Sequence, residues 1–242
     1  MSVPRFYVAA ELAVGVAIPL PESVAHHACR VLRLRTGDPL VLFNGRGGQF
    51  RARLTAEGHA AIEAFDSIER ESPLSIALIQ ALIPQDRLDW VIEKATELGV
   101  AQIVVVAAAR SVVRLDERRR LARMARWREI AIAACCQSGR NRIPQIRWAP
   151  GLPQALAEAT AEARLLLSPR AKHHFDPARI SGPLALAIGP EGDWTADEIA
   201  VAERHGFQPV QFGPRILRAE TAALSAVAAV QAACGDLAVP RS

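Results

Sequence analysis

The residues best suited to chemistry stand together at residues 213–221. Arg215, Arg218 and Glu220 lie in this stretch, and two large apolar residues separate the two arginines. An arginine can stabilise an anion that develops during a reaction, and a carboxylate can accept a proton. The apolar pair can form the wall of a pocket for a flat ring such as adenine. The alternative is a surface ion pair between Arg218 and Glu220, which would contribute little to stability.

A similar loop precedes this stretch. Each loop follows a short apolar run, at residues 184–188 and 209–212, and each begins with Gly-Pro. In the first loop, Gly189 and Gly192 let the backbone approach a ligand closely. Ligands of α/β proteins bind at the carboxyl ends of strands, so two such loops predict one shared pocket. The alternative is that each Gly-Pro segment is only a turn.

The motifs of several commoner sites are absent from the sequence. No G-x-G-x-x-G follows a first strand, no G-x-x-x-x-G-K-[ST] is present, and no G-x-S-x-G marks a serine nucleophile. The cysteines lack the spacing of a zinc site, and His26 and His27 have too few further ligands nearby. We therefore expect no metal, and we interpret the cysteines as small buried residues in a reducing compartment. They are Cys29, Cys135, Cys136 and Cys234.

Length and composition favour a folded protein with one large or two small domains. The chain has 242 residues, and hydrophobic residues make up 50% of it. No apolar run reaches the roughly 18 residues of a membrane span. Residues 1–6 lack the apolar segment of a signal peptide, so we expect a cytoplasmic protein with no membrane partner. The net charge of +4 is a weak indication of a polyanionic partner.

Residues 1–70 have the pattern of a small β-barrel, because short apolar runs alternate with turns. The Asn44-Gly45 step is typical of a hairpin turn, and residues 21–32 show helical spacing. A polar segment that ends in Pro73 marks the domain boundary. Strands are predicted at residues 3–8, 39–43, 48–54 and 60–65.

From residue 74 the pattern changes to alternating strands and helices, which predicts an α/β domain with a parallel sheet over residues 73–242. Thr195 and Glu198 stand at capping-box spacing and predict the start of a helix. A further, alanine-rich helix follows the second Gly-Pro loop. Strands are predicted at residues 74–79, 102–107, 145–148, 164–168, 184–188 and 209–212. Earlier helices are predicted at residues 86–98, 116–137 and 152–161.

Seven arginines lie between residues 114 and 128, at the start of one predicted helix. Arginine suits contacts with phosphate groups, which favours a nucleic-acid surface. The alternative is a solvated helix face.

His26 and His27 have two possible roles, packing of the short helix at residues 21–32 and contact with RNA.

The two loops and several other segments resemble the 16S ribosomal RNA uridine-N3 methyltransferase family of the SPOUT superfamily. The strings at residues 188–192 and 212–222, with Thr195 and Glu198, look like the cofactor loops of that family. The resemblance covers nearly the whole chain. Other matching segments are Arg5-Phe6, His27, Val31-Leu32-Arg33, Gly37-Asp38, residues 94–99, Arg110-Ser111 and residues 137–144.

The chain departs from the family pattern at three places. Cys136 stands where glutamate is usual, Asp193 stands where a second glycine is expected, and Pro84-Gln85 replaces a Lys-Gly step. These departures leave the roles of those positions open. The string from Arg215 to Thr221 is unaffected.

The resemblance implies a PUA-like RNA-binding β-barrel at residues 1–70 and a SPOUT methyltransferase domain at residues 73–242, with a C-terminal trefoil knot and a homodimer. It also implies methyl transfer from S-adenosyl-L-methionine to N3 of one uridine of 16S rRNA in the 30S subunit, uridine 1498 in the standard numbering. One alternative is a SPOUT enzyme that acts on another RNA site or atom, such as ribose O2′. Another is a non-catalytic RNA-binding assembly protein.

The site residues follow from the matched positions. Arg218 is expected to stabilise the uridine anion, and Glu220 to act as the base or to orient Arg218. The cofactor-binding residues are expected to be Leu166, Leu167, Ser168, Ile188, Gly189, Pro190, Gly192, Phe212, Gly213, Ile216, Leu217 and Ala222. The RNA-binding residues are expected to be Arg5, His27, Arg30, Arg33, Arg110, Arg140 and Arg142.

Overall fold

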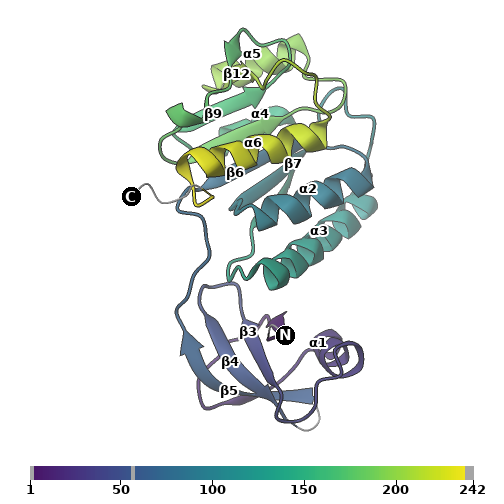
Figure 1. Cartoon of the computed structure of the whole chain (residues 1–242). Coiled ribbons are helices and arrows are strands. Elements are labelled where there is room, and N and C mark those ends of the chain that lie inside the picture. The colour runs from purple at the N-terminus through teal and green to yellow at the C-terminus, as the bar shows by residue number, and fades with distance from the viewer. Residues whose placement is uncertain (1–2, 56–57, 238–242) are drawn as a thin grey trace. The chain divides into compact units, whose positions relative to one another are not determined.

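The computed structural model describes residues 3–55 and 58–237. Its contacts divide the chain into two units, which Figure 1 draws in one view. The smaller unit comprises Met1–Glu71 and Cys135–Ile143, and the larger comprises Ser72–Ala134 and Pro144–Ser242. The sequence suggested one boundary near residue 72, whereas the contacts also assign a short segment from mid-chain to the smaller unit.

The smaller unit is built on a five-stranded sheet with the strand order β1-β3-β4-β5-β2. β1 and β3 pair parallel, and the other neighbours pair antiparallel. In β4, residues 50, 52 and 54 are buried while Arg51 and Arg53 are exposed, as the period of two in a half-buried strand requires. A short helix, α1 (Glu22–His26), continues as a π-helical turn (His27–Val31). The strands are β1 (Arg5–Tyr7), β2 (Ala17–Pro19), β3 (Pro39–Phe43), β4 (Gln49–Leu54) and β5 (His59–Asp66).

The mid-chain segment joins the smaller unit through buried polar side chains. Arg140, which is 3% exposed, forms an ion pair with Glu71 at 2.5 Å. The Asn141 amide nitrogen donates to the carbonyl of Ile68 at 2.7 Å, and its oxygen accepts a hydrogen bond from Arg5 at 2.8 Å. Buried polar groups need such partners, so the segment belongs to the core of this unit.

The larger unit is a parallel seven-stranded sheet with the order β10-β12-β9-β11-β6-β7-β8. All five residues of β11 are buried, as expected for a strand covered on both faces. The strands are β6 (Ile76–Ala81), β7 (Gln102–Val106), β8 (Gln145–Ala149), β9 (Ala163–Leu167), β10 (His173–His174), β11 (Leu184–Ile188) and β12 (Gln208–Gln211).

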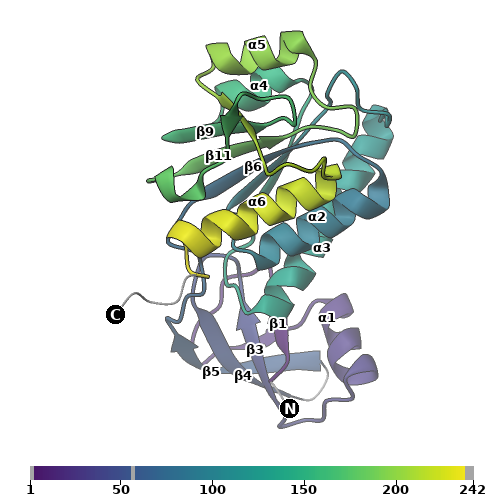
Figure 2. The ribbon, with the colours of Figure 1, turned by 45° about the horizontal axis from the view of Figure 1, so that its top comes forward.

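Helices cover both faces of this sheet (Figure 2). α2 and α6 pack against each other on one face, beside the first part of α3, and α4 packs against α5 on the other. The alanines of α6 allow this close approach, because a small side chain keeps neighbouring backbones near each other. The helices are α2 (Gln85–Glu97), α3 (Glu117–Ser138), α4 (Leu152–Ala157), α5 (Ala196–Arg204) and α6 (Ala219–Cys234).

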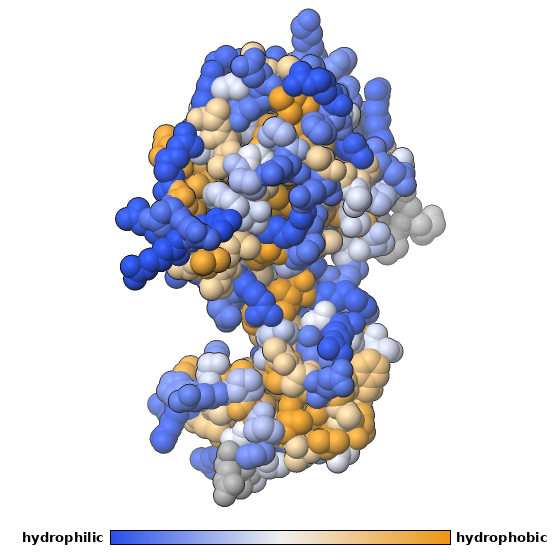
Figure 3. Space-filling view, turned by 180° about the vertical axis from the view of Figure 1, so that it is seen from behind, coloured by the Kyte–Doolittle hydropathy of each residue, from blue (hydrophilic) through white to orange (hydrophobic). Residues whose placement is uncertain are grey.

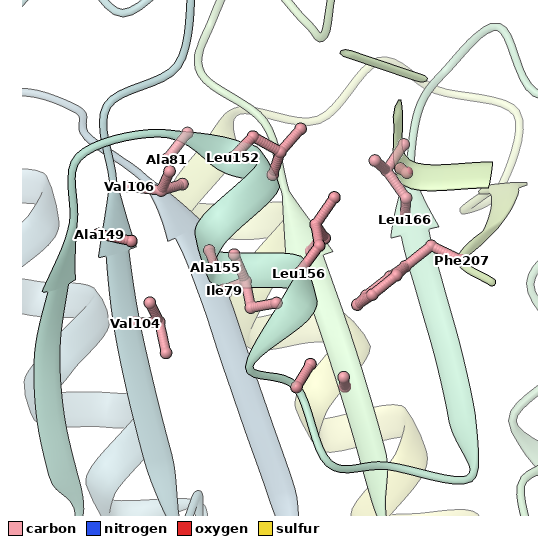
Figure 4. Packing of buried hydrophobic residues seen from close by; sticks show 14 of the residues in the cluster. Ile79, Ala81, Val104, Val106, Ala149, Leu152, Ala155, Leu156, Leu166 and Phe207 are labelled. Atoms are coloured by element: carbon pink, nitrogen blue, oxygen red, sulfur yellow. The ribbon is translucent and has the colours of Figure 1, made fainter. Parts of the chain in front are cut away.

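A hydrophobic cluster lies between the sheet and α4 (Figure 4). Leu152, Ala155 and Leu156 of α4 meet strand residues such as Ile79 and Val104 there. Apolar residues at helical spacing thus pack on apolar residues of the strands, which is the stabilising pattern of an α/β layer.

Most predicted elements are present within a few residues of their predicted ends. The capping box at Thr195 and Glu198 is formed and begins α5. Two strands were not predicted, β2 and β10, because they have only three and two residues. The predicted helix at residues 152–161 ends earlier, at Ala157.

No helix in residues 3–55 and 58–237 is long and apolar enough to cross a bilayer. Across the same ranges, His, Cys, Asp and Glu form no group that could hold a metal ion. On the face drawn in Figure 3, hydrophilic side chains cover most of the larger unit and hydrophobic ones are more extensive on the smaller unit.

Candidate functional site

A pocket opens at the carboxyl ends of β9, β11 and β12. Because these parallel strands end at the same edge of the sheet, the loops that follow them converge although they are far apart in sequence. The pocket is lined by Leu167, Ser168, Pro169, Ile188, Gly189, Pro190, Glu191, Asp193, Gln211, Phe212, Arg215, Ile216, Leu217, Ala219 and Ala222.

The structure brings together most of the residues predicted to bind a cofactor, and Leu166, Gly192 and Gly213 are the exceptions. Leu166 is fully buried in the hydrophobic cluster beside Phe207 (Figure 4). Successive residues of a strand point to opposite faces, so Leu167 reaches the pocket and Leu166 does not. The residues that do line it are Leu167, Ser168, Ile188, Gly189, Pro190, Phe212, Ile216, Leu217 and Ala222.

Six further residues line the pocket that were not among the predicted cofactor-binding residues. Glu191 and Asp193 stand directly beside Gly192, and their charge within a predicted ligand loop was the available signal. Arg215 was noticed for its charge only. The remaining three, Pro169, Gln211 and Ala219, carry no sequence signal beyond their closeness to strand ends.

Gly189 lies where a side chain would be tightly packed. A Cβ at this position would lie 3.2 Å from Nε1 of Trp194, a side chain that is only 2% exposed. At Gly192, a Cβ would lie 3.1 Å from the Cβ of Arg110. A side chain at either position would therefore require its neighbour to shift by a few tenths of an ångström. Of the two glycines, Gly189 lines the pocket and Gly192 does not.

Arg110 holds the first loop in place. Its Nη1 donates to the carbonyl oxygens of Gly192 at 2.8 Å and Trp194 at 3.4 Å. The neighbouring Ala109 N–H donates to the carboxylate of Glu198 at 2.8 Å. A side chain predicted to bind RNA is thus hydrogen-bonded to the first Gly-Pro loop.

A second tether joins this loop to the end of β9. The hydroxyl of Ser168 donates to Oδ2 of Asp193 at 3.0 Å. Ser168 is buried, and both residues line the pocket. This hydrogen bond fixes the position of the Asp193 carboxylate in the wall of the pocket.

The two proposed catalytic residues differ in their surroundings. Arg218 is the N-cap residue of α6 and is exposed, whereas Glu220, in the first turn, is 8% exposed. Oε1 of Glu220 lies 3.8 Å from Nε of Arg87, and Oε2 is buried without a hydrogen bond from any described residue. Arg87 also forms an ion pair with Glu191 at 3.2 Å. Among the described ion pairs Glu220 therefore joins Arg87, and Arg218 forms none with it.

The second loop is open to solvent. Ile216 is 86% exposed, and Leu217 is half-buried. Both line the pocket, so an apolar edge stands at its mouth. Such an edge gains hydrophobic contact when a ligand or a further surface covers it.

The predicted RNA-binding residues of the smaller unit fall into two groups. His27, Arg30 and Arg33 are exposed in the smaller unit, and the ring of His27 also contacts Phe6 edge-on at 5.8 Å. Arg142 is exposed too, but forms an ion pair with Glu69 at 3.2 Å. These side chains are accessible to a polyanion.

Arg5 and Arg140 form the second group, because both are held within the protein. Arg5 donates to Gln49, to Asn141 and to the carbonyl oxygen of Arg140. Burial lowers the pKa of Arg5, and the nearby positive charge of Arg70 lowers it further. The guanidinium of Arg140 is occupied by Glu71. Their geometry suits a structural task in the smaller unit.

The adjacent cysteines are poorly suited to nucleophilic chemistry. Burial raises the pKa of Cys135 to about 12, and it also raises the pKa of Cys136. The thiolate is the reactive form of cysteine, so both residues are held in the unreactive form at neutral pH. Both are free thiols.

Two family models match the chain. Residues 70–231 match the model described as RNA methyltransferase domain, and residues 20–64 match the model described as RNA methyltransferase PUA domain. Curated relatives include two proteins named ribosomal RNA small subunit methyltransferase E. The one from Synechocystis sp. is 30% identical over 94% of this chain and 77% of its own length. The one from Buchnera aphidicola is 31% identical over 97% of this chain and 98% of its own length.

Solved structures extend the similarity to the whole fold. A methyltransferase from Legionella pneumophila, in complex with the bound cofactor SAM, is 36% identical, with a TM-score of 0.90 over 98% of this chain and 100% of its own. A ribosomal RNA small subunit methyltransferase E from Neisseria gonorrhoeae, bound to S-adenosyl methionine, is 40% identical, with a TM-score of 0.89 over 97% and 99%. The predicted fold class, an α/β domain preceded by a small PUA-like β domain, is confirmed.

Proposed function

The chain belongs to the family of RNA methyltransferases that includes the small-subunit enzymes named E, and we propose that it methylates N3 of uridine 1498 (standard numbering) in 16S rRNA, with S-adenosyl-L-methionine as methyl donor. The observation that carries the proposal is the pocket at the carboxyl ends of β9, β11 and β12. Both loops that resemble the family's cofactor loops contribute to its wall.

The residues of the pocket fit such a cofactor. Ile188, Leu217 and Ala222 supply apolar wall for the adenine, and the Gly189 backbone gives close approach. Ser168, Glu191 and Asp193 supply polar groups for the remainder of the molecule. A cofactor site usually has a mainly apolar pocket that contains a few polar groups.

The chemical task left to the protein is alignment of the uridine and removal of its N3 proton. When bound, the cofactor supplies a methyl group that its sulfonium charge already activates. The methyl group moves from sulfur to N3, and the N3 proton leaves to a base. We assign Arg218 to the negative charge that develops on the uracil ring, because it is exposed and stands at the N-cap of α6.

Glu220 is assigned to positioning rather than to proton removal. Its carboxylate is buried and paired with Arg87. It is therefore poorly placed to accept the N3 proton of a uracil ring that enters from solvent. The pair links the start of α6 to α2, and Arg87 also links it to Glu191 of the first loop. Arg218 is two residues from Glu220, so an ordered first turn of α6 keeps Arg218 in place.

We propose that the RNA binds four exposed basic residues of the smaller unit, which are His27, Arg30, Arg33 and Arg142. Arg142 also forms an ion pair with Glu69. A stacked target base must be turned out of its helix to reach the pocket, which costs a few kcal/mol that these contacts help to offset.

We propose a cytoplasmic location because the substrate is rRNA. The homodimer and the trefoil knot that the family resemblance implies stay predictions, and light scattering in solution tests the first.

Two experiments test the proposed function. Calorimetry with S-adenosylmethionine and S-adenosylhomocysteine should show binding at one site per chain. Mass spectrometry of 16S rRNA from a strain that lacks this protein should show loss of one methyl group at a uridine N3, restored by the wild-type gene. Loss of a ribose O2′ methyl group would identify a different target atom, and absence of cofactor binding would identify a non-catalytic RNA-binding protein.

A further inference from the structure

Asp193 adopts a backbone conformation that favours glycine. Its φ is +60°, and it is one of two described residues other than glycine with positive φ. Asp and Asn are tolerated in this region better than most residues, but still at a cost in free energy. Strained residues of this kind gather at functional sites, where another interaction holds them. The family resemblance also led us to expect glycine here, so the side chain is an addition of this chain.

The hydroxyl of Ser168 holds the Asp193 side chain in place. Its one proton is donated to Oδ2 of Asp193 at 3.0 Å, and its oxygen accepts the N–H of Arg170 at 3.3 Å. The Asp193 N–H donates to the carbonyl of Pro190 at 3.0 Å, which closes the turn beneath it. Ser168 has therefore no proton left to offer a ligand.

The other carboxylate oxygen remains available. Oδ1 of Asp193 receives no hydrogen bond from residues 3–55 or 58–237, and Asp193 is half-buried in the pocket wall. A carboxylate is an acceptor only, so the group that meets it must be a donor. An acceptor that is partly withdrawn from water and is held rigidly loses little entropy on binding and favours a hydroxyl or an ammonium group.

We propose that the carboxylate of Asp193, held by Ser168, accepts a hydrogen bond from a donor group of the bound cofactor and so sets the affinity of this pocket. This inference rests on the proposed function, since it takes S-adenosylmethionine as the ligand. That molecule carries donors of two kinds, the neutral hydroxyl and amino groups of its adenosine part and the charged α-ammonium. Either kind can donate a hydrogen bond to a carboxylate.

The test is calorimetric binding by Asp193→Gly and Asp193→Asn. Glycine removes the carboxylate and suits the positive φ, and asparagine keeps the shape and also tolerates that φ. We expect S-adenosylhomocysteine to bind Asp193→Gly about tenfold or more weakly than it binds wild type, since a hydrogen bond to a charged group is lost. Asp193→Asn should bind with intermediate affinity. Circular dichroism checks that each variant is folded.

A second probe separates the α-ammonium from the donors of the adenosine part. 5′-Methylthioadenosine has the ribose hydroxyls and the adenine amino group but no α-ammonium, so an equal loss for both probes assigns Asp193 to the adenosine part. A loss for S-adenosylhomocysteine alone assigns it to the ammonium. Asp197→Asn is the matched control, because it removes one exposed carboxylate nearby that does not line the pocket, and it should bind both probes as wild type does.

The role of Ser168 is tested by combining substitutions. Ser168→Ala alone should weaken binding, because the carboxylate is no longer held. In the Asp193→Gly background the same change should have little further effect, since the two act through one hydrogen bond. Unchanged binding by Asp193→Gly and Asp193→Asn would overturn this inference alone. Failure of the wild-type protein to bind either probe would overturn the proposed function as well.

Discussion

Oε1 of Glu220 lies 3.8 Å from Nε of Arg87, so the buried carboxylate at the start of α6 is paired with a guanidinium from α2. The same guanidinium reaches Glu191 in the loop after β11. One cation thus connects three elements that are distant in sequence. The charge of Glu220 is balanced before any RNA is bound.

Replacing Arg87 by methionine should lower the free energy of unfolding by about 2 kcal/mol, because it leaves the Glu220 carboxylate buried without a cation. The double variant Arg87→Met with Glu220→Gln should recover much of the loss. Urea unfolding measures both. Arg119→Met, which breaks an exposed ion pair with Asp116, serves as the control and should change stability by less than about 0.5 kcal/mol.

Glu220→Gln separates positioning from proton removal. A positioning residue replaced by its amide should lower the methylation rate several-fold, while the pH at which the rate rises stays the same. A catalytic base so replaced would cost about a hundredfold or more and change the shape of the pH–rate profile. The second outcome would contradict our assignment of Glu220.

Arg218→Ala should slow methylation of 16S rRNA by about a hundredfold or more, the usual effect of removing a group that stabilises a developing negative charge. Its side chain is exposed, so the melting temperature should stay near that of wild type. Arg218→Lys should retain part of the rate, because the positive charge is kept. A wild-type rate for Arg218→Ala would rule out the proposed role.

Arg110→Ala should weaken binding of S-adenosylhomocysteine in the absence of RNA. The substitution removes hydrogen bonds to the carbonyl oxygens of Gly192 and Trp194, so the loop of the pocket is less well ordered. We expect a loss of about three- to tenfold in calorimetry, the equivalent of about 1 kcal/mol. Arg118→Ala, at an exposed arginine of α3, should bind as wild type does. If Arg110→Ala binds cofactor normally and only RNA weakly, Arg110 is an RNA contact instead.

Arg30→Ala and Arg33→Asn should each weaken RNA binding and reduce the slope of log K against log salt concentration by about one. Asparagine is chosen at residue 33 because φ there is +56°. Arg53→Ala is the control, since it removes the same charge from an arginine that Glu63 already pairs. A slope equal to that of wild type in both variants would show that neither arginine contacts phosphate.

The stability of wild type relative to Cys135→Ala should depend on pH. Burial raises the pKa of Cys135 from 9.0 to about 12 in the folded state. Below pH 9 the thiol is neutral in both the folded and the unfolded state, so its contribution is constant. Between pH 9 and 12 the unfolded state ionises first, and wild type should lose up to about 1.4 kcal/mol per pH unit relative to the variant. Urea unfolding at pH 8 and pH 10 measures the difference.

The sequence predicts long periodic elements well and side-chain partners poorly. α2 was predicted because Leu88, Val91, Ile92 and Ala95 repeat at helical spacing, and all four are buried. The hydrogen bonds of Arg110 join residues more than 80 positions apart, and only tertiary packing brings those residues together. The residue type alone does not show whether an arginine is exposed or holds other parts of the protein together.

The candidate site shows the same division. The pocket was predicted because two Gly-Pro loops follow apolar runs, a local feature. Whether Leu166 or Leu167 faces it depends on the register of β9, which is set by pairing with β11 and β12. The contact of Arg87 with Glu220 was not predicted, because nothing within α2 indicates which carboxylate lies opposite.

The two-part composition of the smaller unit has a consequence for biosynthesis. A ribosome releases residues 1–71 well before residues 135–143, yet Arg5 needs Arg140 and Asn141 as hydrogen-bond partners. The nascent N-terminal segment therefore lacks these polar partners while it is alone outside the exit tunnel. It gains them only after residues 72–134 of the larger unit have been translated. For the same reason, a gene fragment that stops at codon 71 encodes a unit in which Arg5 lacks these hydrogen bonds.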